Sequence, residues 1–260
     1  MGDHQAGHDI GERLYVPGAT IVHRLPAHLK LLAAVTTILV VVATPPTWLW
    51  AFAGYAALAV ALVATAKLPL RVVVPRMVVE VPVMVFALLL PILGTGPRIA
   101  VGPLTLSQAG LWAGWGIIVK ATFGVVTSIV LAATTSTNDM VAGLRRLRVP
   151  DQFVQIFAAM VRYVHVVGAE ARRMNRARTA RGFTAKGPRS WSVLGQSLGT
   201  LFIRSYERGE RVHLAMLSRG YTGAMPTAPA APDSRSQLMW AVSFPAVAAV
   251  VWLVVASGYR

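Results

Sequence analysis

Long apolar runs, separated by short polar or basic segments, dominate the pattern of residues along this 260-residue chain. Each run approaches the roughly 20 residues that a helix needs to cross a bilayer, although the first and third are short. The third contains Pro82 and ends at Pro91, which predicts a kinked helix. The pattern predicts an all-α integral membrane protein with about five membrane-spanning helices: residues 29–43, 48–66, 78–93, 111–133 and 238–256.

The composition supports this class and excludes others. Apolar residues make up 55% of the chain and charged residues only 13%, about half the usual share of a soluble domain. The net charge of +15 would suit a nucleic-acid-binding protein, but the apolar runs would not. The chain has no cysteine, which excludes disulfides, thiolate metal sites and cysteine nucleophiles. We therefore expect a bilayer partner and no nucleic acid.

Basic residues alternate along the loops and predict the orientation. The segment 135–236 carries 16 Lys and Arg against 6 Asp and Glu, and Lys67, Arg71 and Arg76 follow the second run. Cytoplasmic loops are enriched in Lys and Arg. The chain is therefore expected in the cell membrane, with its N-terminus and segment 135–236 in the cytoplasm. An odd number of spans places its C-terminus outside.

The cytoplasmic segment has the pattern of two long helices. The first is predicted from Pro150 to Arg181, apolar in its first half and basic in its second; the second is predicted from Trp191 to Arg219. The two predicted helices end with similar sequences. The first closes with Ala180-Arg181-Gly182 and an aromatic residue. The second closes 38 residues later with Ser218-Arg219-Gly220 and an aromatic residue.

The repeated ending has two interpretations. Glycine after the last helical turn, followed by an apolar residue, is a common helix stop, and this explains either copy alone. Two copies in one segment favour a second interpretation. A pair of outward guanidinium groups suits docking onto a two-fold partner, since Arg binds carboxylates and carbonyls through a rigid fork of donors.

Other candidate sites are weaker. His4 and His8 lie near Asp3 and Asp9, but a disordered terminus explains them better than a metal site, so no metal is expected. The chain contains no phosphate-binding G-x-x-x-x-G-K-[ST] motif, and it shows no paired carboxylates or Ser nucleophile elbow.

Two charges fall within the predicted spans. Lys120 lies in the middle of the fourth and Glu80 near the start of the third. Intramembrane charges often mark a transport pathway. A buried pair of the two, or Lys120 bonded to helix carbonyls, is the structural alternative that we favour.

At this point several stretches together resemble the T component, EcfT/CbiQ type, of energy-coupling factor (ECF) transporters, a branch of the ABC transporters. The opening stretch His23–Pro26 with Lys30-Leu31-Leu32 is similar to a family motif before the first span. Thr134–Thr137 with Asp139-Met140 and Leu147–Pro150 resembles the entry to the coupling domain. Arg162-Tyr163, the run 170–178 and the two Arg-Gly endings complete the likeness, with Ser218 where the family has Ala.

The resemblance implies a coupling subunit without catalytic activity or a bound cofactor. Two ABC ATPase subunits (EcfA/EcfA' or CbiO type), which bind the ATP and Mg²⁺, would each take one Arg-Gly ending in a groove. One membrane-embedded S component would capture a vitamin or transition-metal ion and pack on the apolar first half of the first long helix. The residues expected in that contact are Phe153, Ile156, Phe157, Met160 and Val164.

The resemblance also implies the organisation of the chain. We expect an N-terminal segment (1–28), four spans (29–134), the coupling domain (135–236) and a last span (237–260). Two alternatives remain: a self-contained secondary transporter, although inverted repeats are absent, and a membrane enzyme whose basic domain binds lipid. The sequence does not identify the transported substrate.

Overall fold

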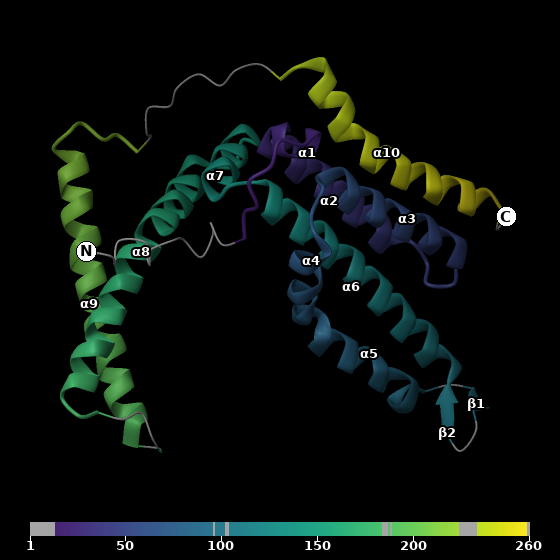
Figure 1. Ribbon diagram of the computed structural model, residues 1–260, viewed down its shortest axis with the longest axis horizontal. Helices are drawn as coiled ribbons and strands as arrows, with labels where there is room; N and C mark the ends of the chain where they lie inside the picture. The colour runs from purple at the N-terminus through teal and green to yellow at the C-terminus, as the bar shows by residue number, and fades with distance from the viewer. Residues whose placement is uncertain are drawn as a thin grey trace. The chain divides into compact units, whose positions relative to one another are not determined.

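The computed structural model describes residues 14–95, 97–101, 104–183, 187, 189–223 and 233–258, and helices form most of it (Figure 1). Its elements follow in chain order. They are α1 (Ile21–Arg24), α2 (Ala27–Ala43), α3 (Leu49–Ala66), α4 (Leu70–Arg76), the 3₁₀ turn η1 (Met77–Glu80), α5 (Val81–Leu93), β1 (Arg98–Val101), β2 (Leu104–Ser107), α6 (Gln108–Thr134), α7 (Thr137–Arg146), α8 (Asp151–Ala180), α9 (Arg189–Leu217) and α10 (Arg235–Gly258).

Among the described residues, five helical segments are long and apolar enough to cross a membrane: α3, the run Leu70–Leu93, α6, α8 and α10. This number agrees with the prediction, but the set does not. The predicted first span corresponds to α2, which has 17 residues and falls just short of this length. The fifth segment is instead α8, which we predicted as a cytoplasmic helix. It meets the length and hydropathy criteria because its first half is apolar, and it has the lowest mean hydropathy of the five.

The third predicted span begins earlier than expected. Residues 70–76, predicted as part of a basic loop, form α4, so the helical run extends from Leu70 to Leu93. The turn η1 interrupts this run just before Pro82, whose missing N–H breaks the α-helical ladder. Figure 1 shows α4 and α5 pointing in different directions on either side of this turn, as a kink requires.

A small hairpin and a short helix complete the elements that the pattern did not predict. Strands β1 and β2 pair antiparallel, with Arg98 opposite Ser107, and lead directly into α6. Four residues in each strand are too few to give a clear alternation of apolar and polar positions. Helix α7 follows α6 and is strongly amphipathic.

The described chain divides into two compact units, and the division falls inside α7, between Gly143 and Leu144. One unit contains α1 to α6, the start of α7, and α10; the other contains the end of α7, α8 and α9. The core of the first unit gathers around Tyr55, whose ring contacts Phe52 and Phe123. Its hydroxyl lies 2.9 Å from Thr44 Oγ1, so the buried polar group is satisfied.

Helices α5 and α6 run antiparallel and approach closely (Figure 1). A Cβ atom added at Gly110 would lie 2.3 Å from Leu90 O, and one added at Gly114 would lie 2.6 Å from Ala87 O. Only glycine allows this approach of backbone to backbone. The two glycines thus serve packing within the chain.

Candidate functional site

The first Arg-Gly ending forms a regular helix stop. Arg181 is the C-cap of α8, and Gly182 follows with φ +78°. The Gly182 N–H donates to Thr179 O at 3.0 Å, and the Phe183 N–H donates to Arg178 O at 3.1 Å. This pair of bonds is the Schellman motif, which satisfies the last carbonyls of a helix and requires a residue that tolerates positive φ.

The second ending repeats the positive φ and both hydrogen bonds of the first. Gly220 has φ +80°, and its N–H donates to Leu217 O at 3.0 Å. The Tyr221 N–H donates to Met216 O, also at 3.0 Å. The sequence repeat at a spacing of 38 residues is therefore a structural repeat of one helix-terminating geometry.

All six residues of the two endings are exposed: Ala180, Arg181, Gly182, Ser218, Arg219 and Gly220. Within the described residues, neither the Arg181 nor the Arg219 guanidinium has a hydrogen bond or ion pair. A neighbouring arginine behaves differently, because Arg178 stacks on the Phe183 ring and donates to Ser197 Oγ at 2.9 Å. The two motif arginines thus present their full set of donors to solvent.

Hydrogen bonds show that α8 and α9 run antiparallel. Arg178, near the end of α8, bonds to Ser197, near the start of α9, and Glu170 binds Arg204 at 2.5 Å. At the other end, the Tyr221 hydroxyl donates to Gln155 Oε1 near the start of α8. From one contact to the next, the residue number on α8 falls while the residue number on α9 and the segment after it rises, as antiparallel helices require.

The antiparallel arrangement separates the two Arg-Gly endings. One lies at the C-terminal end of α8, and the segment after the other contacts Gln155, in the first turns of α8. Arg181 lies 26 positions after Gln155, which corresponds to about 40 Å of helix. The structure does not bring the two endings together on one small surface; each occupies its own end of the helix pair.

Glu170 joins the two helices at mid-length. It accepts hydrogen bonds from Arg173, one turn along α8, and from Arg204 on α9. These hydrogen bonds, with Arg173 first and Arg204 second, hold the pKa of the Glu170 carboxyl below its usual range. Glu170 therefore stays ionised at neutral pH and keeps the link between α8 and α9.

The apolar positions predicted on the first long helix lie on one exposed face of α8. Their exposed fractions range from 40% to 64%, so a large part of each side chain is open. They recur at helical spacing: Phe153, Ile156, Phe157, Met160 and Val164. A contiguous apolar face of this kind marks a surface for another protein or for lipid.

Helix α9 carries a second exposed apolar face, which the sequence analysis did not assign to the site. Leu198, Phe202 and Tyr206 follow one another at intervals of four residues and are each at least 66% exposed. The spacing was visible in the sequence. Exposure, however, depends on which face α8 covers, and only the structure shows that.

Two of the stretches that carry the family resemblance meet in space. The buried ammonium of Lys30, at the start of α2, donates to Thr134 O at 2.7 Å and to Thr135 Oγ1 at 3.3 Å, at the end of α6. A cation bonded to the last carbonyls of a helix also complements its dipole. A Cβ added at Gly143 would lie 2.9 Å from His28 N, so α7 also approaches α2 through backbone.

The two intramembrane charges do not pair with each other. Lys120 Nζ donates to Val42 O at 2.8 Å, across from α6 to the end of α2. Glu80, only 2% exposed, accepts a hydrogen bond from Thr122 Oγ1 at 2.5 Å. Each charge is held by a different partner, and the lysine adopts the carbonyl-bonded arrangement.

The described residues contain no group of three or more His, Asp or Glu side chains that could hold a metal ion. His4, His8, Asp3 and Asp9, for which we expected no metal site, lie outside the described residues.

Comparison with known proteins identifies a family and several relatives. The profile of the CbiQ family, described as cobalt transport protein, matches residues 18–229. The chain is 27% identical to an energy-coupling factor transporter transmembrane protein EcfT of Bacillus selenitireducens, over 80% of this chain and 82% of that one. It is 29% identical to a cobalt transport protein CbiQ of Rhodobacter capsulatus, over 49% of this chain and 53% of that one.

Another relative matches a shorter stretch. An uncharacterized protein of Methanocaldococcus jannaschii is 33% identical over 100 residues. That match covers 38% of this chain and 37% of the relative, so the chain spans little more than a third of that protein's length.

Proposed function

This chain belongs to the CbiQ family of cobalt transport proteins, a multi-pass membrane component of a cobalt or ECF-type transport system, and we propose that it is the system's coupling subunit. In this role it has no catalytic activity of its own. It transmits motion from two cytoplasmic ABC ATPases, which hold ATP and Mg²⁺, to an S component that carries a vitamin or a transition-metal ion. The observation that carries the proposal is the pair of identical, exposed Arg-Gly endings on α8 and α9.

The separation of the endings supports two ATPase partners rather than one. About 40 Å of helix lies between the two ends of the α8–α9 pair, so one shallow groove does not accommodate both. Each ending offers the same geometry, which suits two copies of the same groove. Arg181 and Arg219 bring five donors each, without internal partners among the described residues.

The helices between the endings are suited to transmit force. Each is close to 30 residues long, and Glu170 with Arg204 and Arg178 with Ser197 tie them together. A displacement applied to one end of such a pair moves the whole face between the ends. That face includes the apolar residues of α8 and α9, to which we assign the S component.

In this proposal α8 lies in the cytoplasm although its first half is apolar. Its second half carries Arg172, Arg173, Arg176 and Arg178, which a bilayer would not accept without partners. The orientation places the basic segment and the N-terminus inside and the C-terminus outside, as the distribution of Lys and Arg predicts.

The experiment is co-purification of the full chain with candidate ABC ATPases. The double substitution Arg181→Glu with Arg219→Glu is expected to abolish the complex and leave membrane insertion unchanged, because it reverses the charge that each groove meets. The matched control is Arg176→Glu with Arg208→Glu, which reverses two exposed arginines on the same helices outside the endings. A complex that survives the first pair, or is lost equally with the second, contradicts the assignment.

A second experiment tests the apolar face. Phe157→Ser with Met160→Ser is expected to release the S component from the assembled transporter while the ATPases remain bound. Loss of both kinds of partner together would show a folding defect instead, and retention of the S component would remove α8 from that contact.

A further inference from the structure

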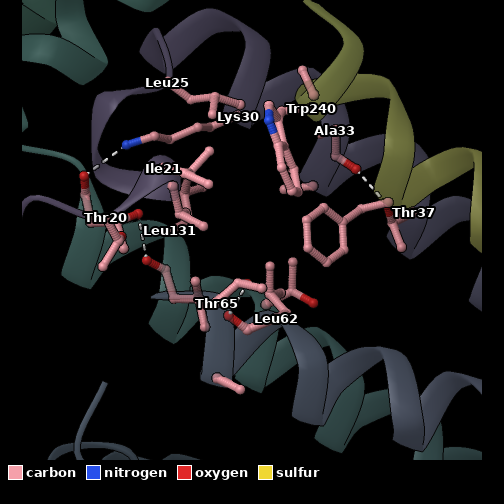
Figure 2. Close-up of a pocket in the computed structure, with 18 of the residues that line it drawn as sticks. Thr20, Ile21, Leu25, Lys30, Ala33, Thr37, Leu62, Thr65, Leu131 and Trp240 are labelled. Carbon is pink, nitrogen blue, oxygen red and sulfur yellow. Dashed lines mark hydrogen bonds between the residues drawn. The ribbon is translucent and has the colours of Figure 1, made fainter. Parts of the chain in front are cut away.

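An apolar cavity of about 460 Å³ lies among α1, α2, α3, α6 and α10, all within one unit of the chain (Figure 2). Its volume is in the range of about 300–1,000 Å³ that ligand sites occupy. Leu58, Leu62, Phe123 and Phe244 are among the side chains around it. An apolar space of this size between membrane helices favours an apolar occupant over water.

The length of the cavity is close to half the hydrocarbon thickness of a bilayer. Along α2 its lining runs from Lys30 to Thr37, and along α6 from Phe123 to Thr134. The two stretches are about 10 Å and 16 Å long. The hydrocarbon layer of one leaflet is roughly 15 Å thick. The two stretches are the start of α2 and the end of α6, which lie on the side of the basic segments.

The polar side chains around the cavity are nearly all satisfied within the chain. Lys30 bonds to Thr134 O, and Thr37 donates to Ala33 O at 2.6 Å. Three further hydroxyls are hydrogen-bonded within the chain: that of Thr20 to the His23 ring, that of Thr65 to Leu62 O and that of Thr134 to Val130 O. The Thr127 hydroxyl has no partner among the described residues, but its oxygen is covered by protein atoms. A polar ligand would therefore find almost no free donor or acceptor in the cavity.

Lys67 is the exception and lies where a headgroup would be. It ends α3 with φ +51° and is exposed, and within the described residues its side-chain ammonium has no hydrogen bond or ion pair. Trp240, near the start of α10, also lines the cavity, and indole rings favour the level of the headgroups. An ammonium beside the entrance to an apolar space complements an anion with a hydrocarbon tail.

We propose that this cavity binds one acyl chain of an anionic phospholipid, with the lipid phosphate beside Lys67. The lipid belongs to the leaflet on the side of the basic loops, and its chain lies between α2, α3, α6 and α10. The proposal requires that these helices cross the bilayer. It does not depend on ATPase coupling, so its failure and that of the proposed function are separate results.

The test measures lipid retained by the purified full chain in detergent, by native mass spectrometry, after addition of phosphatidylglycerol or phosphatidylcholine. We expect one phosphatidylglycerol per chain. Lys67→Gln should lower its occupancy about fivefold, since a cation near the membrane surface contributes about that factor. Ala33→Phe should lower retention of both lipids at least about tenfold, because the ring fills the cavity.

Arg71→Gln is the matched control. Arg71 is an exposed cation four residues after Lys67 that does not line the cavity, so its loss should leave occupancy unchanged. Where Ala33→Phe does not fold, Ala34→Leu fills the same cavity with a smaller change. The proposal is overturned if the native chain retains no lipid, if a folded filling variant retains it, or if Arg71→Gln and Lys67→Gln lower occupancy equally.

Discussion

His28 Nε2 lies 2.8 Å from Asp233 Oδ2, so a contact between residues 205 positions apart joins the start of α2 to the segment that enters α10. The chain leaves the first unit through α7 and returns to it just before Asp233. The pair therefore fixes the return of the chain after the α8–α9 unit. His28 is only 8% exposed, which makes the loss of its partner costly.

The first prediction concerns this pair. Asp233→Ala and His28→Ala should each lower the free energy of unfolding by about 1–2 kcal/mol, and the double variant should lose less than the sum. Thermal unfolding of the purified chain in detergent measures this. His213→Ala, at an exposed position of α9, is the control and should have no effect. Strictly additive losses would show that the two residues do not interact.

A second prediction concerns the close approach of α5 and α6. Gly114→Ala should destabilise the chain by about 3 kcal/mol or more, because the new Cβ would lie 2.6 Å from the rigid backbone atom Ala87 O. Gly124→Ala lies in the same helix, with nothing within 4 Å of the new atom, and should be neutral or stabilising. Equal unfolding temperatures for the two variants would contradict the packing.

The helix stops give a third prediction. In Gly182→Ala and Gly220→Ala the new Cβ would have no atom within 4 Å. The only cost is therefore the positive φ that alanine must adopt, about 1–2 kcal/mol of stability for each substitution. We expect faster hydrogen exchange in the last turns of α8 and α9 and weaker ATPase association. Gly168→Ala, inside α8, should slow exchange there, because alanine is the better helix former. Unchanged exchange at both endings would show that the stops do not need glycine.

A fourth prediction concerns Glu80, which is buried against Thr122. Thr122→Val keeps the shape of the side chain but leaves the Glu80 carboxyl without its donor, at a cost of about 1–3 kcal/mol. Thr122→Ser retains a hydroxyl and should recover most of the loss. Unfolding temperatures of the three proteins decide this; if serine fails to rescue, packing of the threonine methyl is the cause.

The last prediction concerns pH. Because the pKa of Glu170 is lowered in the folded chain, its contribution to the α8–α9 pairing is complete above its unfolded pKa, about 4.3. That contribution is lost as the pH falls through the lower, folded pKa. Spin labels on cysteines introduced at Asn175 and Thr200, in a chain without native cysteine, should report one constant distance from pH 6 to 8 and a broader distribution in acid.

Glu170→Gln is the control for the pH experiment. It removes the titrating group and should give the broader distance distribution already at neutral pH, with no further change in acid. A native chain that broadens between pH 6 and 8 would place the pH-sensitive contact elsewhere.

Much of this fold followed from local patterns in the sequence. Hydropathy predicted the helices α3, α6 and α10 to within a few residues. The change from apolar to basic positions predicted α8, and spaced apolar positions predicted α9. The two Arg-Gly stops were also predictable, because a Schellman ending depends on five or six consecutive residues. The order of helices and the basic loops were enough to propose a membrane anchor with a basic coupling segment.

The tertiary structure decided what depends on residues far apart in the chain. The partner of Lys120 is Val42 O rather than Glu80, and α8 and α9 pair antiparallel, which sets the two endings apart. The cavity beside Lys67 exists because five separate helices leave a common space. Hydropathy and helical periodicity are properties of short windows of sequence, whereas these contacts depend on which backbones approach one another, as Gly110 and Leu90 do.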